Sequence, residues 1–287
     1  MCRLFGMSAG EEPARARFWL LDAPDSLVVQ SHREPDGTGL GWFDERGAAH
    51  VSKQAHAAYE DRTFAREARE VVSRTFVAHV RFASTGALER RNTHPFEQHG
   101  RLFAHNGVLE DLPALDAHLG PDAALVKGDT DSERLFALIT RETEARGGDV
   151  EAGIEAACAW VADSLPLFAI NFVLACPDGL WALRYPDTHP LYVLEHPAGR
   201  PLAHTSTLGT RVHAHEGEGR ALTVLASERM DEDPGWQELA SGELLHVDGR
   251  RRLRRRTILG RPPAHRLTLA DLSGKARASQ AHANATP

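Results

Sequence analysis

The sequence predicts an α+β protein in which antiparallel sheets are covered by helices on their outer faces. Strand patterns come first, two helical patterns follow in the middle of the chain, and strand patterns then return. Regular alternation of strand and helix is missing, which disfavours a doubly wound parallel sheet. Tight-turn sequences between alternating apolar runs favour hairpins instead.

The first third of the chain supplies strands and one helix. Alternating, β-branched and aromatic residues indicate the strands, and Asp61 before a run of helix formers indicates a helix cap. We expect a hairpin over residues 39–53, a helix over 60–72, a strand over 75–84 and a strand over 101–107. Asn106-Gly107 is a typical turn pair, so the last strand should run into a turn there.

The rest of the chain predicts a helix pair and several hairpins. Helical periodicity covers residues 131–146 and 150–165, and the Gly-Gly-Asp between them predicts antiparallel packing. Strands are expected over 167–185 around a Pro-Asp-Gly turn, at 190–195, at 221–227, and over 243–259 as a hairpin. No linker divides residues 1–272, which we expect to form a single domain, and residues 273–287 are small and polar, which predicts a disordered tail.

Composition limits the partners and the compartment. The 287 residues carry a formal net charge of -7, which argues against nucleic acid or an anionic membrane as the partner. No apolar run approaches the roughly 18 residues of a membrane span, and the start MCRLFGMSAG lacks the apolar region of a secretory signal. The three cysteines form no CxxC pair, so we expect reduced thiols in the cytoplasm.

The sequence predicts no cofactor and no metal. The glycines at 37, 39 and 41 do not fit G-x-G-x-x-G, and no Walker motif is present, so a tight turn before a strand is the better interpretation. The sixteen histidines include no HExxH. The arginine run from Arg250 to Arg256 could bind an anion, although a charged sheet edge is the simpler interpretation.

Four short stretches carry candidate chemistry: MCRLFG, HVRFASTG from His79, HNG from His105 and GDTDSE from Gly128. Each alone has an ordinary explanation as a chance cysteine, a surface ion pair, a turn or a helix cap. Their order and spacing together resemble the class II glutamine amidotransferases over at least residues 2–133. The later segments NFVLACPDGLWALRYP and VLASERMDEDPGWQELASGELLHV resemble strands of stand-alone bacterial members.

The resemblance implies a fold and a set of roles. The fold is the four-layer αββα sandwich of the N-terminal-nucleophile hydrolases. Cys2, freed by removal of Met1, would be the nucleophile, and Asn106 and Gly107 would form the oxyanion hole. Arg81 would bind the α-carboxylate of a glutamine-like substrate, and Asp131 would hold its α-ammonium.

The chemistry is coherent without the resemblance. A primary amide is a poor electrophile, so its hydrolysis benefits from a thiolate, a base and two donors aimed at the oxyanion. A terminal amine has a pKa of about 7.7 to 8.0 and a cysteine thiol one of about 8.5. The amine can therefore accept the thiol proton and later deliver a proton to departing ammonia. Cys2 as the first residue would supply both groups.

Departures from the family pattern concern the substrate. Arg3 and Leu4 stand where synthase-fused members have glycine and isoleucine, Phe82 where many have tryptophan, and Ser84-Thr85 where many have threonine-histidine. We expect these changes around the substrate end of the pocket and count Phe82 and Ser84 among the substrate-binding residues. The chain stops where a synthase domain would begin, and it resembles the compact group that includes the γ-glutamyl amidase of ergothioneine biosynthesis.

The sequence thus predicts an amidohydrolase that cleaves glutamine or a γ-glutamyl amide through a Cys2 thioester. One alternative is a glutaminase subunit that delivers ammonia to a separate synthase partner. Another is a non-catalytic binding module that kept the fold, against which the joint presence of Cys2, Arg81, Asn106, Gly107 and Asp131 argues. A bile-salt or penicillin type acylase would also start with cysteine but would not need the charged pair.

Overall fold

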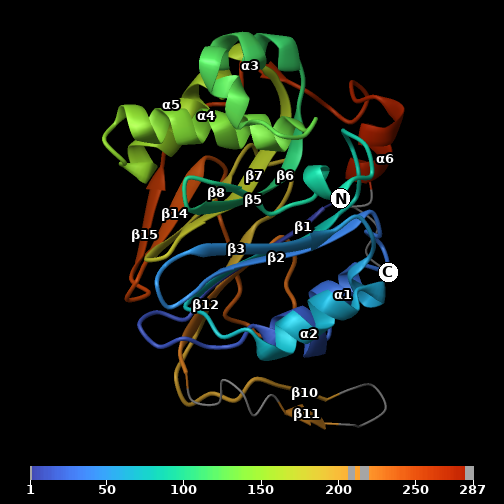
Figure 1. The fold of residues 1–287 in the computed structure, drawn as a ribbon, viewed down its shortest axis with the longest axis vertical. Helices are drawn as coiled ribbons and strands as arrows, with labels where there is room; N and C mark the ends of the chain where they lie inside the picture. Colours follow the sequence, from blue (N-terminus) through green and yellow to red (C-terminus); the bar gives the residue numbers. More distant parts are fainter. Residues whose placement is uncertain (1, 206–210, 214–219, 282–287) are drawn as a thin grey trace.

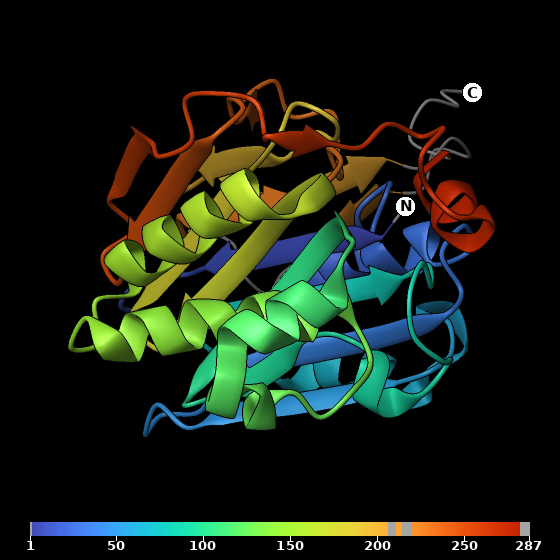
Figure 2. The same cartoon turned by 90° about the horizontal axis from the view of Figure 1, so that it is seen from above.

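The computed structural model describes residues 2–205, 211–213 and 220–281. Figure 1 shows four layers in the order helices, sheet, sheet, helices. Seen from above in Figure 2, the helices of the upper layer lie over the strands beneath them. The expected α+β arrangement, with two antiparallel sheets and helices on the outer faces, is therefore present.

The first sheet has β1 at its centre. Every strand pair in it is antiparallel. Its described strands follow the spatial order β13 (Gln237–Glu238), β9 (Tyr192–His196), β12 (Leu222–Ala226), β1 (Arg3–Ser8), β4 (Thr75–Arg81), β2 (Gly37–Phe43) and β3 (Ala49–Gln54).

The second sheet is built around the long pair of β6 and β7. Its described strands follow the order β15 (Leu253–Thr257), β14 (Glu243–Asp248), β8 (Gly179–Arg184), β7 (Pro166–Cys176), β6 (Arg101–Leu109) and β5 (Phe96–Gln98). A short strand, β16 (His265–Arg266), pairs with β7 in parallel. A separate hairpin joins β10 (Ala203–Thr205) and β11 (Arg211–His213).

Helices cover both outer faces. The first sheet is covered by η1 (Phe18–Asp22), α1 (Leu27–Gln30), η2 (Ala58–Glu60) and α2 (Arg62–Glu70). The second is covered by α3 (Leu112–Leu119), η4 (Gly120–Leu125), α4 (Asp131–Ala145) and α5 (Val150–Ser164). Two further helices are η3 (Arg90–Asn92) and α6 (Gly274–Ala281).

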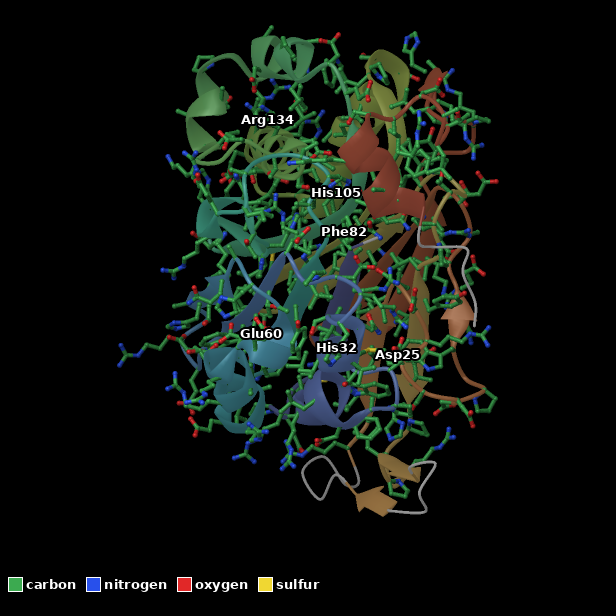
Figure 3. The ribbon with its side chains drawn as sticks, turned by 90° about the vertical axis from the view of Figure 1, so that its right-hand side faces the viewer. Asp25, His32, Glu60, Phe82, His105 and Arg134 are labelled. Atoms are coloured by element: carbon green, nitrogen blue, oxygen red, sulfur yellow. The ribbon has the colours of Figure 1, made fainter. Side chains whose placement is uncertain are left out.

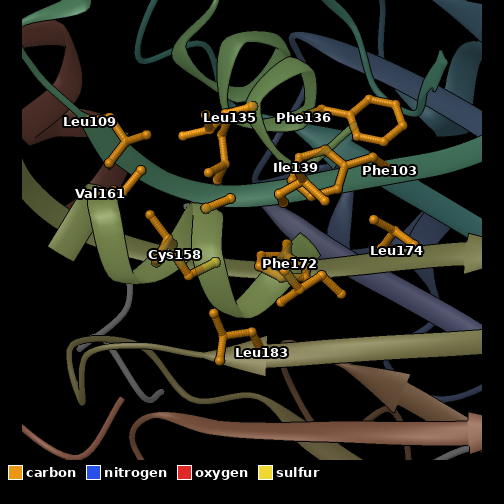
Figure 4. Packing of buried hydrophobic residues seen from close by; sticks show 14 of the residues in the cluster. Phe103, Leu109, Leu135, Phe136, Ile139, Cys158, Val161, Phe172, Leu174 and Leu183 are labelled. Atoms are coloured by element: carbon orange, nitrogen blue, oxygen red, sulfur yellow. The ribbon is translucent and has the colours of Figure 1, made fainter. Parts of the chain in front are cut away.

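Among the described residues, strand alternation divides most of the buried apolar side chains among three large cores, and a smaller fourth cluster lies around Val108 and Leu272. On β1, Leu4 packs into the core between the sheets, whereas Phe5 and Met7 pack into the core beneath α1 and α2. On β6, Leu102 and Ala104 face the first sheet. The third core lies between the second sheet and α4 and α5, and Figure 4 shows its packed side chains: Phe103, Phe136, Phe172, Ile139, Cys158 and Leu183. Because successive strand residues point to opposite faces, both faces of each sheet are buried.

Most expected elements are confirmed. The hairpin of β2 and β3, helix α2 with its Asp61 cap, the pair of α4 and α5, and the hairpin of β14 and β15 all form where predicted. Asp61 Oδ1 accepts hydrogen bonds from the backbone N–H groups of Thr63 and Phe64, at 2.9 and 3.1 Å. The expected strand over 75–84 is too long, because β4 ends at Arg81.

Two expectations are wrong. Asn106-Gly107 is not a turn, because both residues lie inside β6 and pair with β7. The segment from residue 273 is not structureless throughout, because Gly274–Ala281 forms α6. Gln280 on this helix is buried and its Oε1 lies 2.6 Å from Nε2 of His189, a contact that composition cannot predict. The remaining tail, residues 282–287, lies outside the described residues, and the single domain over 1–272 stays a prediction.

The last three arginines of the run lie in the edge strand β15, and they are paired with acidic side chains. Arg254 and Arg256 form ion pairs with Glu151 and Glu155 on α5. Arg255 Nη1 lies 3.4 Å from Glu243 Oε1 on the neighbouring strand. The predicted charged sheet edge is thus confirmed, and the pairing neutralises much of its positive charge.

Candidate active site

Cys2 lies at the start of β1, the central strand of the first sheet, and only 7% of it is exposed. Its thiol donates to the backbone oxygen of Phe82 at 3.3 Å, and the backbone N–H of Phe82 donates to Sγ at 3.4 Å. Burial raises the pKa of the Cys2 thiol. A neutral thiol in this place needs a nearby base before it can attack.

Strand alternation directs the candidate residues into one space. Cys2 continues the side of β1 that carries Leu4, which faces the second sheet. Arg81 shares the same face of β4 with Val77, and Asn106 shares the same face of β6 with Ala104. The two sheets contact each other through β1, β4, β6 and β7. The nucleophile, the arginine and the amide therefore all project into the inter-sheet layer.

Arg81 is the last residue of β4 and is 3% exposed. Its Nη1 and Nη2 donate to the carbonyl oxygens of Ala87 and Thr85, at 3.1 and 2.6 Å. Burial lowers the pKa of Arg81, and the facing Cys2 and Asp131 act in the opposite direction. The guanidinium is thus held in a fixed orientation by the loop that follows its own strand.

Asp36 fixes the point where β4 enters that loop. Its backbone N–H donates to the Arg81 carbonyl at 2.9 Å, and its Oδ2 accepts from the backbone N–H of Ala83 at 2.8 Å. The glycines at 37, 39 and 41, expected in a tight turn before a strand, instead lie within β2, which begins at Gly37. The role of Asp36 beside Phe82 has no local sequence signal, because its partners lie more than forty residues away in the chain.

Asp131, the first residue of α4, is 1% exposed and connects three elements. Its Oδ2 accepts from the backbone N–H of Leu109 on β6 at 2.9 Å. Its Oδ1 accepts from the hydroxyl of Thr85 at 2.9 Å. Thr85 therefore links the buried anion to the buried cation, since its carbonyl accepts from Arg81. From the sequence alone, Thr85 is only a departure from the family pattern, without an assigned role.

Asn106 is 1% exposed, and neither polar atom of its side chain has a hydrogen-bond partner among the described residues. Leaving a buried amide unpaired costs about 1 to 3 kcal/mol, so such a group requires an explanation. A position for a ligand oxygen provides one, because the amide N–H groups can donate to it.

Glycine is required at position 107 because the backbone of β7 passes close to it. An added Cβ would lie 1.8 Å from the carbonyl oxygen of Ala169 on β7 and 2.8 Å from His105 Nε2. His105, on the helix side of β6, is buried with its Nδ1 2.9 Å from Ser132 Oγ on α4. Burial lowers the pKa of His105. Figure 3 shows His105 above Phe82, so these contacts fix β6 just above the candidate site.

The remaining predicted residues contribute less. Phe82 contacts the nucleophile as described, whereas Ser84 is half-buried in the following loop. Arg3 was expected at the substrate end, but it faces away from the inter-sheet layer, and its Nη2 lies 2.7 Å from Glu228 Oε1. Met1 lies outside the described residues.

No group of three or more metal-ligating side chains that could hold an ion occurs in the described part of the chain. Over the same residues, every helix is too short or too polar to cross a membrane.

Comparisons with known proteins match most of the chain. A model of the family described as class II glutamine amidotransferases matches residues 1–261. The γ-glutamyl-hercynylcysteine sulfoxide hydrolase of Mycolicibacterium smegmatis is 29% identical over 239 residues, covering 79% of this chain and 88% of that protein. A putative glutamine amidotransferase of Escherichia coli is 25% identical, with 85% of this chain and 96% of that protein covered.

Solved structures agree on the fold. A glutamine aminotransferase class II domain protein from Silicibacter pomeroyi gives a TM-score of 0.62 at 21% identity and covers 92% of this chain and 100% of that one. The glutamine phosphoribosylpyrophosphate amidotransferase of B. subtilis gives a TM-score of 0.63 at 19% identity, and the match spans half of that longer chain. The four-layer fold is therefore that of the N-terminal-nucleophile amidotransferases. With the family match over 1–261, the chain belongs to the class II glutamine amidotransferases.

Proposed function

We propose that the protein is an amidohydrolase of the cytoplasm that cleaves glutamine or a γ-glutamyl amide through a thioester on Cys2. The observation that carries the proposal is the link through Thr85 between buried Arg81 and buried Asp131, beside the Cys2 thiol. A γ-glutamyl group carries an α-carboxylate and an α-ammonium on one carbon. A fixed cation and a fixed anion held together match that pair.

The proposed reaction uses the chain's own groups. After removal of Met1, the α-amine of Cys2 takes the thiol proton, and Sγ attacks the amide carbon. The Asn106 amide and the Gly107 N–H stabilise the oxyanion that forms. The amine then protonates the leaving nitrogen, which departs as ammonia or a larger amine and leaves a γ-glutamyl thioester. Water attacks the thioester through a second oxyanion, which releases glutamate and the free thiol.

The names of two relatives bear on the proposed hydrolysis: one supports it, and the other supports an alternative function. One relative is named as a hydrolase of a γ-glutamyl compound. Another, 27% identical over 41% of this chain, is named a glutamine–fructose-6-phosphate aminotransferase, and the match covers 19% of its length. A glutaminase that passes ammonia to a separate partner would be the corresponding function here. It shares every step up to ammonia release, so partner-dependent stimulation of glutamine hydrolysis would distinguish it.

The test compares three substrates: L-glutamine, γ-L-glutamyl anilide, and glutaramate, which is glutamine without its α-amine. The wild type should release the amine from the first two and act poorly on glutaramate. Asp131→Asn should lower kcat/KM for the first two about tenfold or more, because the buried α-ammonium loses its counter-charge.

Arg81→Lys keeps the positive charge but loses the guanidinium fork, so it should be impaired as well. Arg62→Lys on α2 is the matched control and should behave as wild type. Equal cleavage of glutaramate and glutamine by the wild type, or unaltered kcat/KM in both site variants, would make a broader acylase the better assignment. No cleavage of any substrate would favour a binding module.

A further inference from the structure

A cavity of about 230 Å³ lies between the loop after β4 and helix α6. Phe82, Leu88 and Asp36 line one side of it, and Lys275 and Ala278 of α6 line the other. Phe82 also exchanges both backbone hydrogen bonds with the Cys2 thiol. Figure 3 shows Phe82 beneath α6, so the residue whose backbone holds the Cys2 thiol also lines the cavity.

Helix α6 is fixed to the strands that carry the oxyanion residues. Leu272 and Ala276 pack against Val108 on β6 and Ala169 on β7, the neighbours of Gly107. Gln280 Oε1 lies 2.6 Å from Nε2 of buried His189. The position of the helix relative to the site is therefore set by packing on β6 and β7.

The lining combines apolar surface with one anion, Asp36, and one cation, Lys275. Leu88 is 59% exposed, and Phe82 and Ala278 add further apolar area. Asp36 uses Oδ2 to accept from Ala83 N–H. Lys275 is exposed and forms no ion pair within the described ranges. A volume of about 230 Å³ far exceeds the roughly 30 Å³ that a water-sized molecule such as ammonia needs, so it suits an amine of ring size.

We propose that this cavity receives the leaving group of the substrate, and that Lys275 binds an anionic group on it. The preferred substrates are then γ-glutamyl amides of amines with an apolar body and a carboxylate or similar acid, rather than glutamine. This inference rests on the proposed γ-glutamyl hydrolysis. It adds a specificity site on α6 that acts on the leaving group and makes no contact with the glutamyl group.

The test uses full-length variants with three substrates that share the γ-glutamyl group: L-glutamine, the anilide, and the 4-carboxyanilide. Lys275→Ala should lower kcat/KM for the carboxyanilide about three- to fivefold, as expected for one partly exposed charge pair. Lys275→Glu should lower it about tenfold or more through repulsion. Both variants should leave glutamine and the anilide within about twofold of wild type. Arg62→Glu, an exposed charge reversal on α2, is the matched control.

Ala278→Trp tests the apolar part, because the indole would fill the cavity. It should lower kcat/KM for both anilides about tenfold while glutamine hydrolysis persists. An unchanged ratio of carboxyanilide to anilide activity in Lys275→Glu would overturn the pocket. So would a parallel fall of glutamine hydrolysis in all α6 variants, which would mean that the helix only supports the fold. These failures leave wild-type glutamine hydrolysis intact, whereas absence of that hydrolysis overturns the proposed function itself.

Discussion

Asn106 on β6 lies in register with Asn171 on β7, yet within the described part of the chain only Asn171 has its amide paired. Asn171 Nδ2 donates to the carbonyl of His189 at 3.1 Å, and its Oδ1 accepts from the backbone N–H of Tyr185 at 2.9 Å. Both side chains are buried. Two identical amides at neighbouring positions are therefore suited to different tasks, one to the fold and the other to a ligand.

The first prediction separates these tasks. Asn106→Ala should lower kcat for glutamine about a hundred- to a thousandfold, the usual cost of one oxyanion donor, with the free energy of unfolding close to wild type. Asn171→Ala should instead lower the free energy of unfolding by about 2 to 4 kcal/mol, because buried backbone groups lose their partners. Steady-state kinetics and denaturant unfolding of both variants give the comparison. A change confined to KM in Asn106→Ala would remove the oxyanion role.

The second prediction concerns Gly107. Gly107→Ala should lower the free energy of unfolding by about 3 kcal/mol or more, since the new methyl would overlap the rigid Ala169 carbonyl. Gly260→Ala is the matched control, because an added Cβ there meets no atom within 4 Å. Thermal unfolding followed by circular dichroism measures both. If the two variants melt alike, β6 and β7 do not approach each other as closely at Gly107 as described.

Local chemistry made much of the fold predictable. The Asp61 cap and the Gly-Gly-Asp link before α5 depend on neighbours in sequence, and both form as expected. Asn106-Gly107 indicates a turn from the sequence, whereas the need for glycine in this strand arises from Ala169 on β7, which lies far along the chain. Helix α6 was missed for the same reason, because Gln280 is buried by its contact with His189.

The residues of the candidate site show the same difference between local sequence signals and contacts made only in the folded chain. Cys2 and Arg81 could be proposed because motif spacing along the chain resembles a family, and the structure turns both toward one layer. Thr85 and Asp36 could not, because Thr85 contacts Asp131 and Asp36 contacts Ala83 only where the packing of β2, β4 and α4 brings these distant residues together. Motif order identifies chemically special residues, whereas the residues that orient them emerge from tertiary contacts.

The third prediction follows from a buried, neutral histidine. His79 is inaccessible, with its ring 4.2 Å from that of His94, and Arg81 and His105 face it. Burial lowers the pKa of His79 to about 3, against about 6.5 in the unfolded chain. The unfolded state therefore binds the proton first as the pH falls. The contribution of His79 to the free energy of unfolding is therefore fully present above about pH 6.5 and is lost as the pH falls toward 3. At pH 5 the loss from this group is about 2 kcal/mol.

Denaturant unfolding at pH 7.5 and pH 5.0 checks whether the free energy of unfolding falls with pH as expected. His79→Leu removes the titrating group, so its loss of stability between the two pH values should be about 1 to 2 kcal/mol smaller than that of wild type. His32→Leu, at an exposed position, should lose as much as wild type. A loss in His79→Leu equal to that of wild type would mean that protonation of His79 does not limit the acid stability.

The nucleophilic role of Cys2 is the central claim, and covalent labelling tests it most directly. Treatment with 6-diazo-5-oxo-L-norleucine, followed by intact-mass analysis and peptide mapping, should find a protein lacking Met1 that carries a single adduct on Cys2. Burial raises the pKa of Cys176 to about 11 and also raises that of Cys158, so both should stay unlabelled, and Cys2→Ala should take up no label. A fully active protein that retains Met1, or an adduct on any other residue, would contradict the account.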